Sequence, residues 1–360
     1  MVLKNFYNLF FFVISSVVFS QTGTTVYQFL NIPISARQAV LGDAVSVRDY
    51  DVNFTAANPV LMNLEMDHML SVNYASYLAD TKIGSISYVR DLEFGHLVSF
   101  NARYMDYGSM PRTDENSIIN GDFSAMDASL GLGYAYQFED NWTIGANVNY
   151  ITSKIDTYSS SAITANAGVT YYFDKSNETL ALVFRNFGYQ IQPYNGVREK
   201  LPFRVDLGYT KILDEFPAAL TITAHDIQQP NISAKTDING QPTKFGRKIL
   251  DHLSFGAELF PGQAFNLRFG YNVKRGSELA VLDQRSFTGL SAGLSIKISS
   301  FRFDYSHMRY HNSSNVNMLG LTLDLVELGG NRRKITGESG SVFLLERLER
   351  FSLIVSLVRT

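Results

Sequence analysis

Residues that could carry enzyme chemistry are few and scattered in this chain of 360 residues. There is no cysteine, which excludes disulfides, thiolate metal sites and cysteine nucleophiles. None of the six histidines has the His-x-x-x-His or glutamate-adjacent spacing of a metalloenzyme. They are His68, His96, His225, His252, His307 and His311. A serine triad assembled across strands stays open, but nothing indicates one. We therefore predict no enzyme, no nucleophile elbow, and no catalytic, cofactor-binding or metal residues.

The elements that position these residues are amphipathic strands. Between Ala128 and Phe138 every second residue is apolar, and the alternation resumes from Trp142 to Tyr150. Such a period of two indicates a β-strand with one apolar and one polar face. We predict fourteen strands, at 67–77, 81–90, 94–106, 124–138, 142–152, 161–173, 179–187, 202–212, 217–226, 250–260, 264–274, 286–298, 300–310 and 316–325.

The connections between these strands alternate between tight turns and longer polar loops, as in outer-membrane barrels. The longer loops are predicted at 107–123, 153–160, 188–201, 227–249, 275–285 and 311–315. Together these patterns predict an all-β fold, a 14-stranded transmembrane β-barrel with an N-terminal lumenal plug segment, in the outer membrane of a Gram-negative bacterium. Both chain ends are expected at the short-turn side. The alternative is a soluble periplasmic or surface β-sandwich, which would be soluble without detergent.

The polar faces carry charges that would point into the lumen. Because a buried unpaired charge is costly, we expect these groups to pair with each other or with a plug rather than to guide a solute. The glycines Gly131 and Gly133 stand in mid-strand with no following helix, so a phosphate-binding loop is not expected. They are predicted to ease close packing of the plug against the wall. With a net charge of −3, nothing favours nucleic-acid binding.

The N-terminus has the charged, apolar and small-residue regions of a signal peptide, predicted at 1–20. An N-terminal plug or hatch segment is predicted at 21–66, the barrel at 67–326 and a C-terminal tail of unknown role at 327–360. Within the plug, Ser35 is expected to cap a short helix that Gly42 ends, and Asn58-Pro59 marks a turn or helix start. The predicted plug residues are Phe29, Leu30, Pro33, Ser35, Arg37, Gly42, Asn58 and Pro59.

The block from Tyr27 to Gly42 (YQFLNIPISARQAVLG) resembles the start of the PorQ family of type IX secretion barrels, which is related to PorV and more distantly to FadL-type transporters. The stretch from Phe287 to Leu325 is also similar, and the layout of 25–325 agrees. The tail departs from the barrel pattern. The resemblance implies a non-enzymatic barrel of the cell-surface attachment complex, anchoring a PorZ-like surface protein beside a PorU-like sortase and a PorV-like barrel, in contact with outer-membrane lipid or lipopolysaccharide.

Two loops are predicted to carry partner binding, because aromatic residues and arginine are enriched at interfaces. Their residues are Tyr189, Tyr194, Arg198, Lys235, Lys244, Arg247 and Lys248. Solvated surface or contact with lipopolysaccharide phosphates is the plainer interpretation. The alternative function is a FadL-like transporter of hydrophobic solutes, which would need an apolar lumen pocket and a lateral opening in the wall. The mostly polar lumen faces count mildly against it.

Overall fold

The computed structural model describes residues 25–116, 118–138, 141–236, 240–278, 287–311 and 314–329. The predicted signal peptide and most of the predicted tail lie outside these residues. The chain divides into one compact unit that ends at Leu325 and a second from Val326 to Thr360. The description below concerns the first unit.

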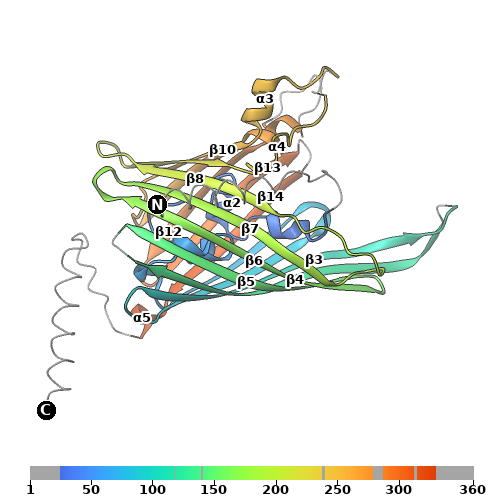
Figure 1. Cartoon of the computed structure of the whole chain (residues 1–360), viewed down its shortest axis with the longest axis horizontal. Coiled ribbons are helices and arrows are strands. Elements are labelled where there is room, and N and C mark those ends of the chain that lie inside the picture. The colour runs from blue at the N-terminus through green and yellow to red at the C-terminus, as the bar shows by residue number, and fades with distance from the viewer. Residues whose placement is uncertain are drawn as a thin grey trace, which may run out of the picture. The chain divides into compact units, whose positions relative to one another are not determined.

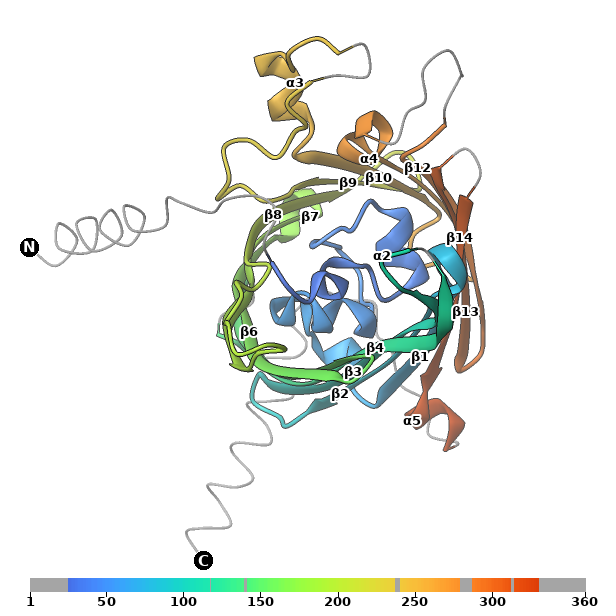
Figure 2. The ribbon, with the colours of Figure 1, turned by 90° about the vertical axis from the view of Figure 1, so that its right-hand side faces the viewer.

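Fourteen antiparallel strands form a closed barrel in which every strand pairs with its sequence neighbours, and β1 closes on β14 through Met69 and Asp324 (Figure 2). The strands are β1 (Met69–Ser76), β2 (Lys82–Asp91), β3 (His96–Thr113), β4 (Ile119–Gln137), β5 (Trp142–Ile155), β6 (Tyr158–Phe173), β7 (Glu178–Gln192), β8 (Arg204–Ile212), β9 (Ala218–Ala224), β10 (Leu253–Leu259), β11 (Phe265–Asn272), β12 (Leu290–Ile298), β13 (Phe301–His311) and β14 (Ser314–Asp324). The predicted strand count and fold class are confirmed.

The apolar face of each strand points outward. In β4 Leu132 is 69% exposed while its neighbour Gly133 faces inward, against Ser99 and Met62. In β5 Val148 is 55% exposed, whereas Asn147 is 1% exposed. A soluble sandwich would bury Leu132 and Val148, so this orientation is that of a membrane barrel. No helix in the described part of the chain is long and apolar enough to cross a membrane.

Strand length differs around the barrel. Strands β3 to β7 have 14–19 residues, and the β3–β4 hairpin extends beyond the rest of the wall (Figure 1). Strands β8 to β12 have 7–9 residues. The predicted loops 107–123, 153–160 and 188–201 therefore begin too early in the sequence, because their first residues still belong to the preceding strands. Strand pairing continues beyond the lipid-facing part of the wall, and there the side chains no longer alternate between apolar and polar.

Short helices complete the unit. The lumen holds η1 (Gln28–Asn31), α2 (Ala36–Val40), η2 (Val52–Ala56), η3 (Pro59–Leu61) and η4 (Leu64–Met66). The connections between strands hold η5 (Leu78–Asp80), η6 (Asp174–Ser176), α3 (Phe245–Leu250) and α4 (Val273–Glu278). Helix α5 (Leu325–Leu328) follows the last strand.

The segment 25–66 passes through the lumen from one end to the other. Thr25 forms a bridge with Lys200, in the connection between β7 and β8, at the long-loop end. After η4 the chain enters β1 at Met69, whose partner is Asp324 at the short-turn end. The two chain ends, which are expected at the short-turn side, lie outside the described residues, and Thr25, the first described residue, lies at the long-loop end.

Candidate functional site

The candidate site is the lumen together with the segment 25–66 that fills it, called the hatch below. Its helix α2 begins at Ser35, whose Oγ accepts a hydrogen bond from the Gln38 amide at 3.3 Å. The chain leaves the helix at Gly42 with a φ of 77°, a conformation that glycine adopts without strain. Asn58 caps η3 by accepting from the Val60 amide, with Pro59 in the first turn. These predicted local structures are confirmed.

Glycines in the wall let the hatch approach the strands closely. A side chain at Gly270 would collide with the Val40 carbonyl oxygen, and one at Gly256 would lie 2.7 Å from Leu41. At Gly293 it would lie 2.8 Å from Val40. The two glycines predicted to ease this packing are Gly131 and Gly133. Gly133 does lie by Met62 of the hatch, whereas Gly131 lies by the wall residues Asn149 and Asn101.

One buried ion-pair cluster joins α2 to the wall strands β10, β11 and β13. Arg37 pairs with Glu258 at 2.7 Å and with Asp49 at 2.5 Å. Asp51 is the third carboxylate around this guanidinium, at 3.9 Å. The other pairs of this cluster are Arg268 with Glu258 and Asp304, and Arg302 with Asp51 and Asp304.

A second cluster lies around Asp43, which follows α2. Its carboxylate pairs with Arg185 at 3.5 Å and with Arg204 at 3.3 Å, and both arginines also pair with Asp206. His225 lies beside Arg204, with its Nδ1 2.8 Å from a guanidinium nitrogen and its Nε2 3.0 Å from the Gly42 carbonyl. The ring of His225 therefore links the hatch to the arginine on β8. The expectation that lumen charges pair with each other or with the plug is confirmed for these groups.

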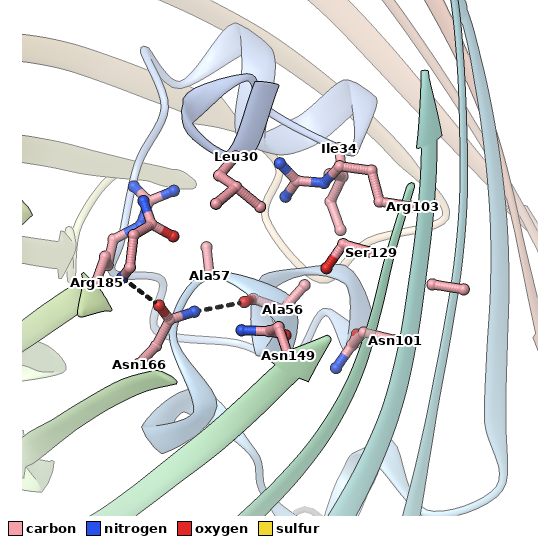
Figure 3. A pocket seen from close by; sticks show the side chains of 12 residues that line it. Leu30, Ile34, Ala56, Ala57, Asn101, Arg103, Ser129, Asn149, Asn166 and Arg185 are labelled. Carbon is pink, nitrogen blue, oxygen red and sulfur yellow. Dashed lines mark hydrogen bonds between the residues drawn. The ribbon is translucent and has the colours of Figure 1, made fainter. Parts of the chain in front are cut away.

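Arg103 is an exception. It forms no salt bridge with any described residue, and its guanidinium donates to the Phe29 carbonyl at 2.7 Å. It lies on one side of a small cavity, opposite Arg185 (Figure 3). The other lining residues include Leu30, Ile34, Ala57, Asn101, Asn149 and Asn166. The cavity has a volume of about 20 Å³, which holds about one water molecule.

The wall is interrupted beside this cavity. The β7–β8 ladder ends at Arg185 and Arg204, although β7 continues to Gln192. A register shift in the β6–β7 ladder leaves Asn166 without a partner on β7, and its side chain instead accepts from the Asn186 amide and donates to the Ala56 carbonyl. The gap in the ladder is bridged by Asn186, which donates to the Pro202 carbonyl at 3.2 Å. The pattern of alternation gave no signal of this interruption.

The predicted partner-binding residues occupy different environments. Tyr189 lies on β7 and is 58% exposed, with the guanidinium of Arg198 5.9 Å from its ring centroid. Tyr194 instead faces the lumen, where its hydroxyl contacts Ser153 and its ring lies by Tyr27. Burial raises the pKa of Tyr194 to about 12. Its assignment to an exposed loop surface therefore does not fit this environment.

The basic residues of the other loop are also separated. Lys235 is exposed, as is Lys244 at the start of α3. Arg247 pairs with Asp251 at 2.8 Å, and Lys248 is half-buried. Among the described residues, no contact joins these basic residues to Tyr189 and Arg198.

The sequence does contain one Gly-x-Ser-x-Gly pattern, at Gly289–Gly293, although no nucleophile elbow is predicted. Its Ser291 lies within β12 and donates to the Val40 carbonyl at 2.7 Å. An elbow needs the serine on a strand-to-helix turn with an adjacent base, so Ser291 is a contact between wall and hatch. Among the described residues, no group of three histidine or acidic side chains could hold a metal ion.

No protein-family model and no curated protein matches the sequence. Solved structures do match. The toluene transporter TodX of Pseudomonas putida is 12% identical with a TM-score of 0.52, over 83% of this chain and 98% of that one. The CymD monoaromatic hydrocarbon channel is also 12% identical with a TM-score of 0.52, over 81% and 97%. A FadL homologue of Pseudomonas aeruginosa gives a TM-score of 0.49 at 13% identity, over 84% and 100%.

At this identity the likeness is one of fold. It extends over nearly the whole length of the two hydrocarbon channels, and it agrees with the outward apolar faces described above. The chain is thus a transmembrane β-barrel that shares its fold with the toluene transporter TodX and with CymD.

Proposed function

We propose that this chain is an outer-membrane channel for small hydrophobic solutes, with the hatch as its gate. The observation that carries the proposal is the shared fold with two hydrocarbon channels, together with a wall interruption that lies beside the lumen cavity. Solutes of this class partition into the bilayer, so an exit through the wall would deliver them without crossing water. At this place β7 runs on from Asn186 to Gln192 without a ladder partner on β8.

The hatch has to move for such a solute to pass. An apolar cavity of about 150 Å³ holds benzene, whereas the cavity between Arg103 and Arg185 measures about 20 Å³. In the proposed channel this arrangement is the closed state. The contacts that would break first are those of α2 and Asp43 with the wall, because residues 186–203 line the interruption next to them.

An engineered disulfide tests the gate. The Ser46 and Thr210 hydroxyl oxygens lie 3.1 Å apart, one on the hatch and one on β8, and the chain has no other cysteine. In a host that lacks its own hydrocarbon channel, we expect the wild-type chain to raise uptake of radiolabelled toluene above the vector level. The oxidised Ser46→Cys/Thr210→Cys variant should lose this uptake and regain it on reduction.

Each single cysteine variant is the matched control and should transport under both conditions. Uptake at the vector level from a wild-type barrel that is folded in the membrane, as judged by heat-modifiable migration, would contradict the channel.

A second candidate is the scaffold of a type IX attachment complex, as the PorQ-like block implies. It is favoured by the sealing of the lumen, because two buried ion-pair clusters hold the hatch against the wall. In this case PorZ-like, PorU-like and PorV-like partners would co-purify from the native membrane. Replacing both Tyr189 and Arg198 by alanine should reduce co-purification, and Lys235→Ala should have a smaller effect. Unchanged co-purification would contradict this docking surface.

A further inference from the structure

The helix α3 lies beside the barrel rather than over its mouth. It stands outside the ring of strands, next to the wall around β8 to β10, in two perpendicular views (Figures 1 and 2). The β3–β4 hairpin extends farther along the barrel axis than α3 does (Figure 1). The helix belongs to the connection between β9 and β10 at the long-loop end. This lateral position brings it to the level where a membrane would meet the wall.

The two faces of α3 differ in chemistry. Phe245 is 78% exposed and Ile249 52%, and at 100° per residue they lie about 40° apart on one side of the helix. On the opposite side Arg247 pairs with Asp251 at 2.8 Å and donates to the Val273 carbonyl at 3.1 Å. These contacts fix the polar side of α3 to α4, so its apolar side is directed away from the protein.

The wall next to α3 is short. Strand β8 has nine residues, and β9 and β10 have seven each, whereas a tilted strand needs about 9–11 residues to span the hydrocarbon layer. The outward residues Ile222 on β9 and Phe255 on β10 are 41% and 38% exposed and belong to the lipid-facing surface. The apolar side of α3 lengthens this surface at the point where the strands end too early.

Charge at the helix agrees with a lipid surface. Lys244 is exposed at the start of α3, and Lys248 lies beside the apolar side. Cations that flank an apolar helix face are typical of helices in the interface of a bilayer, where they meet lipid phosphates.

We propose that α3 is an interfacial anchor, which inserts Phe245 and Ile249 into the outer leaflet and places Lys244 and Lys248 at lipid phosphates. It completes the apolar band over the short strands β8 to β10. The proposal does not depend on whether the barrel is a channel or a scaffold. It also assigns Lys244 and Lys248 to lipid rather than to a protein partner.

Tryptophan fluorescence tests this placement, because the chain has a single tryptophan. In a Trp142→Phe background, Phe245→Trp reports on α3, and Ile118→Trp, at the tip of the β3–β4 hairpin and 61% exposed, is the matched control. Each full-length variant is reconstituted in vesicles of brominated phosphatidylcholine and phosphatidylglycerol. We expect Phe245→Trp to emit at shorter wavelength and to lose most of its fluorescence to the brominated acyl chains.

The control should respond to aqueous iodide and not to bromine. Iodide quenching of Phe245→Trp equal to that of the control, without quenching by bromine, would overturn the proposal and leave α3 as a surface for a soluble partner. Heat-modifiable migration of every variant verifies that the barrel is folded.

Discussion

Arg37 and Glu258 stand 221 residues apart and form a two-point ion pair between hatch and wall. The Nε atom of Arg37 lies 2.9 Å from Oε1 of Glu258, and a terminal nitrogen lies 2.7 Å from Oε2. Both side chains are almost fully buried. Two parallel charge-assisted bonds fix direction as well as distance, so this pair sets how α2 sits in the lumen.

Removing one partner of this pair should loosen the hatch. In Arg37→Ala, the Glu258 carboxylate loses two of its hydrogen bonds in a buried site, and breaking such a pair costs about 3–5 kcal/mol. We expect faster proteolysis of residues 25–66 in the folded barrel, and higher toluene uptake if the chain is a channel. Limited proteolysis followed by mass spectrometry measures the first effect.

Arg48→Ala is the matched control, because Arg48 belongs to the same segment but pairs with a mostly exposed Asp174. A pair at the surface contributes about 0–1 kcal/mol, so protection of the hatch should change little. Equal proteolysis of the two variants would show that the Arg37 pair does not hold the hatch.

Gly270 should tolerate no side chain while the hatch is in place. A methyl group there would collide with the Val40 carbonyl oxygen, which belongs to α2 and cannot retreat without moving the helix. Overpacking of this kind costs about 1–3 kcal/mol. We expect Gly270→Ala to lower the thermal midpoint of the barrel. The control is Gly84→Ala, where a side chain would meet nothing within 4 Å, and a larger loss at Gly84 would contradict the packing described.

The barrel itself could be predicted from the sequence because its main constraint is local. Lipid outside and polar groups inside impose a period of two on every strand, and Leu132 beside Gly133 is as visible in the sequence as in the fold. The capping residue Ser35 and the helix end at Gly42 are local signals as well. They need no knowledge of what surrounds them.

The site required contacts that no local pattern encodes. Arg37 pairs with Glu258, which lies far away in the sequence. Asp43 pairs with Arg185 and Arg204, which lie on two neighbouring strands. The end of the β7–β8 ladder was hidden because the alternation in β7 continues past it. Likewise Tyr194 has the composition of an interface residue, and only its contact with Ser153 reveals that it faces inward.

Asp67, just before β1, should make the short-turn end sensitive to acid. Burial would raise its pKa, but hydrogen bonds from the Asp91 amide and His68, with the charge of Arg90, lower it below its usual value. A lowered pKa in the folded state stabilises the fold above the unfolded pKa of about 3.9, and this contribution is lost as the pH falls through the folded value. The difference in unfolding free energy between wild type and Asp67→Asn should therefore shrink below about pH 4. Guanidinium titrations in detergent at several pH values measure it, and a difference that stays constant with pH would contradict the assignment.

The orientation of the strands is tested by two arginine substitutions on β4. Leu132 and Ile119 are 69% and 68% exposed, so burial within the protein does not distinguish them. Leu132 lies in the part of β4 that pairs with β3 and β5, whereas Ile119 pairs only with Thr113 in the hairpin that extends beyond the wall. Arginine on the lipid face costs about 2–4 kcal/mol at mid-membrane and about 0–1 kcal/mol near the interface. Leu132→Arg should therefore lower the unfolding free energy in lipid vesicles by that larger amount, and Ile119→Arg should leave it nearly unchanged. Similar values for the two variants would mean that water, not lipid, surrounds Leu132.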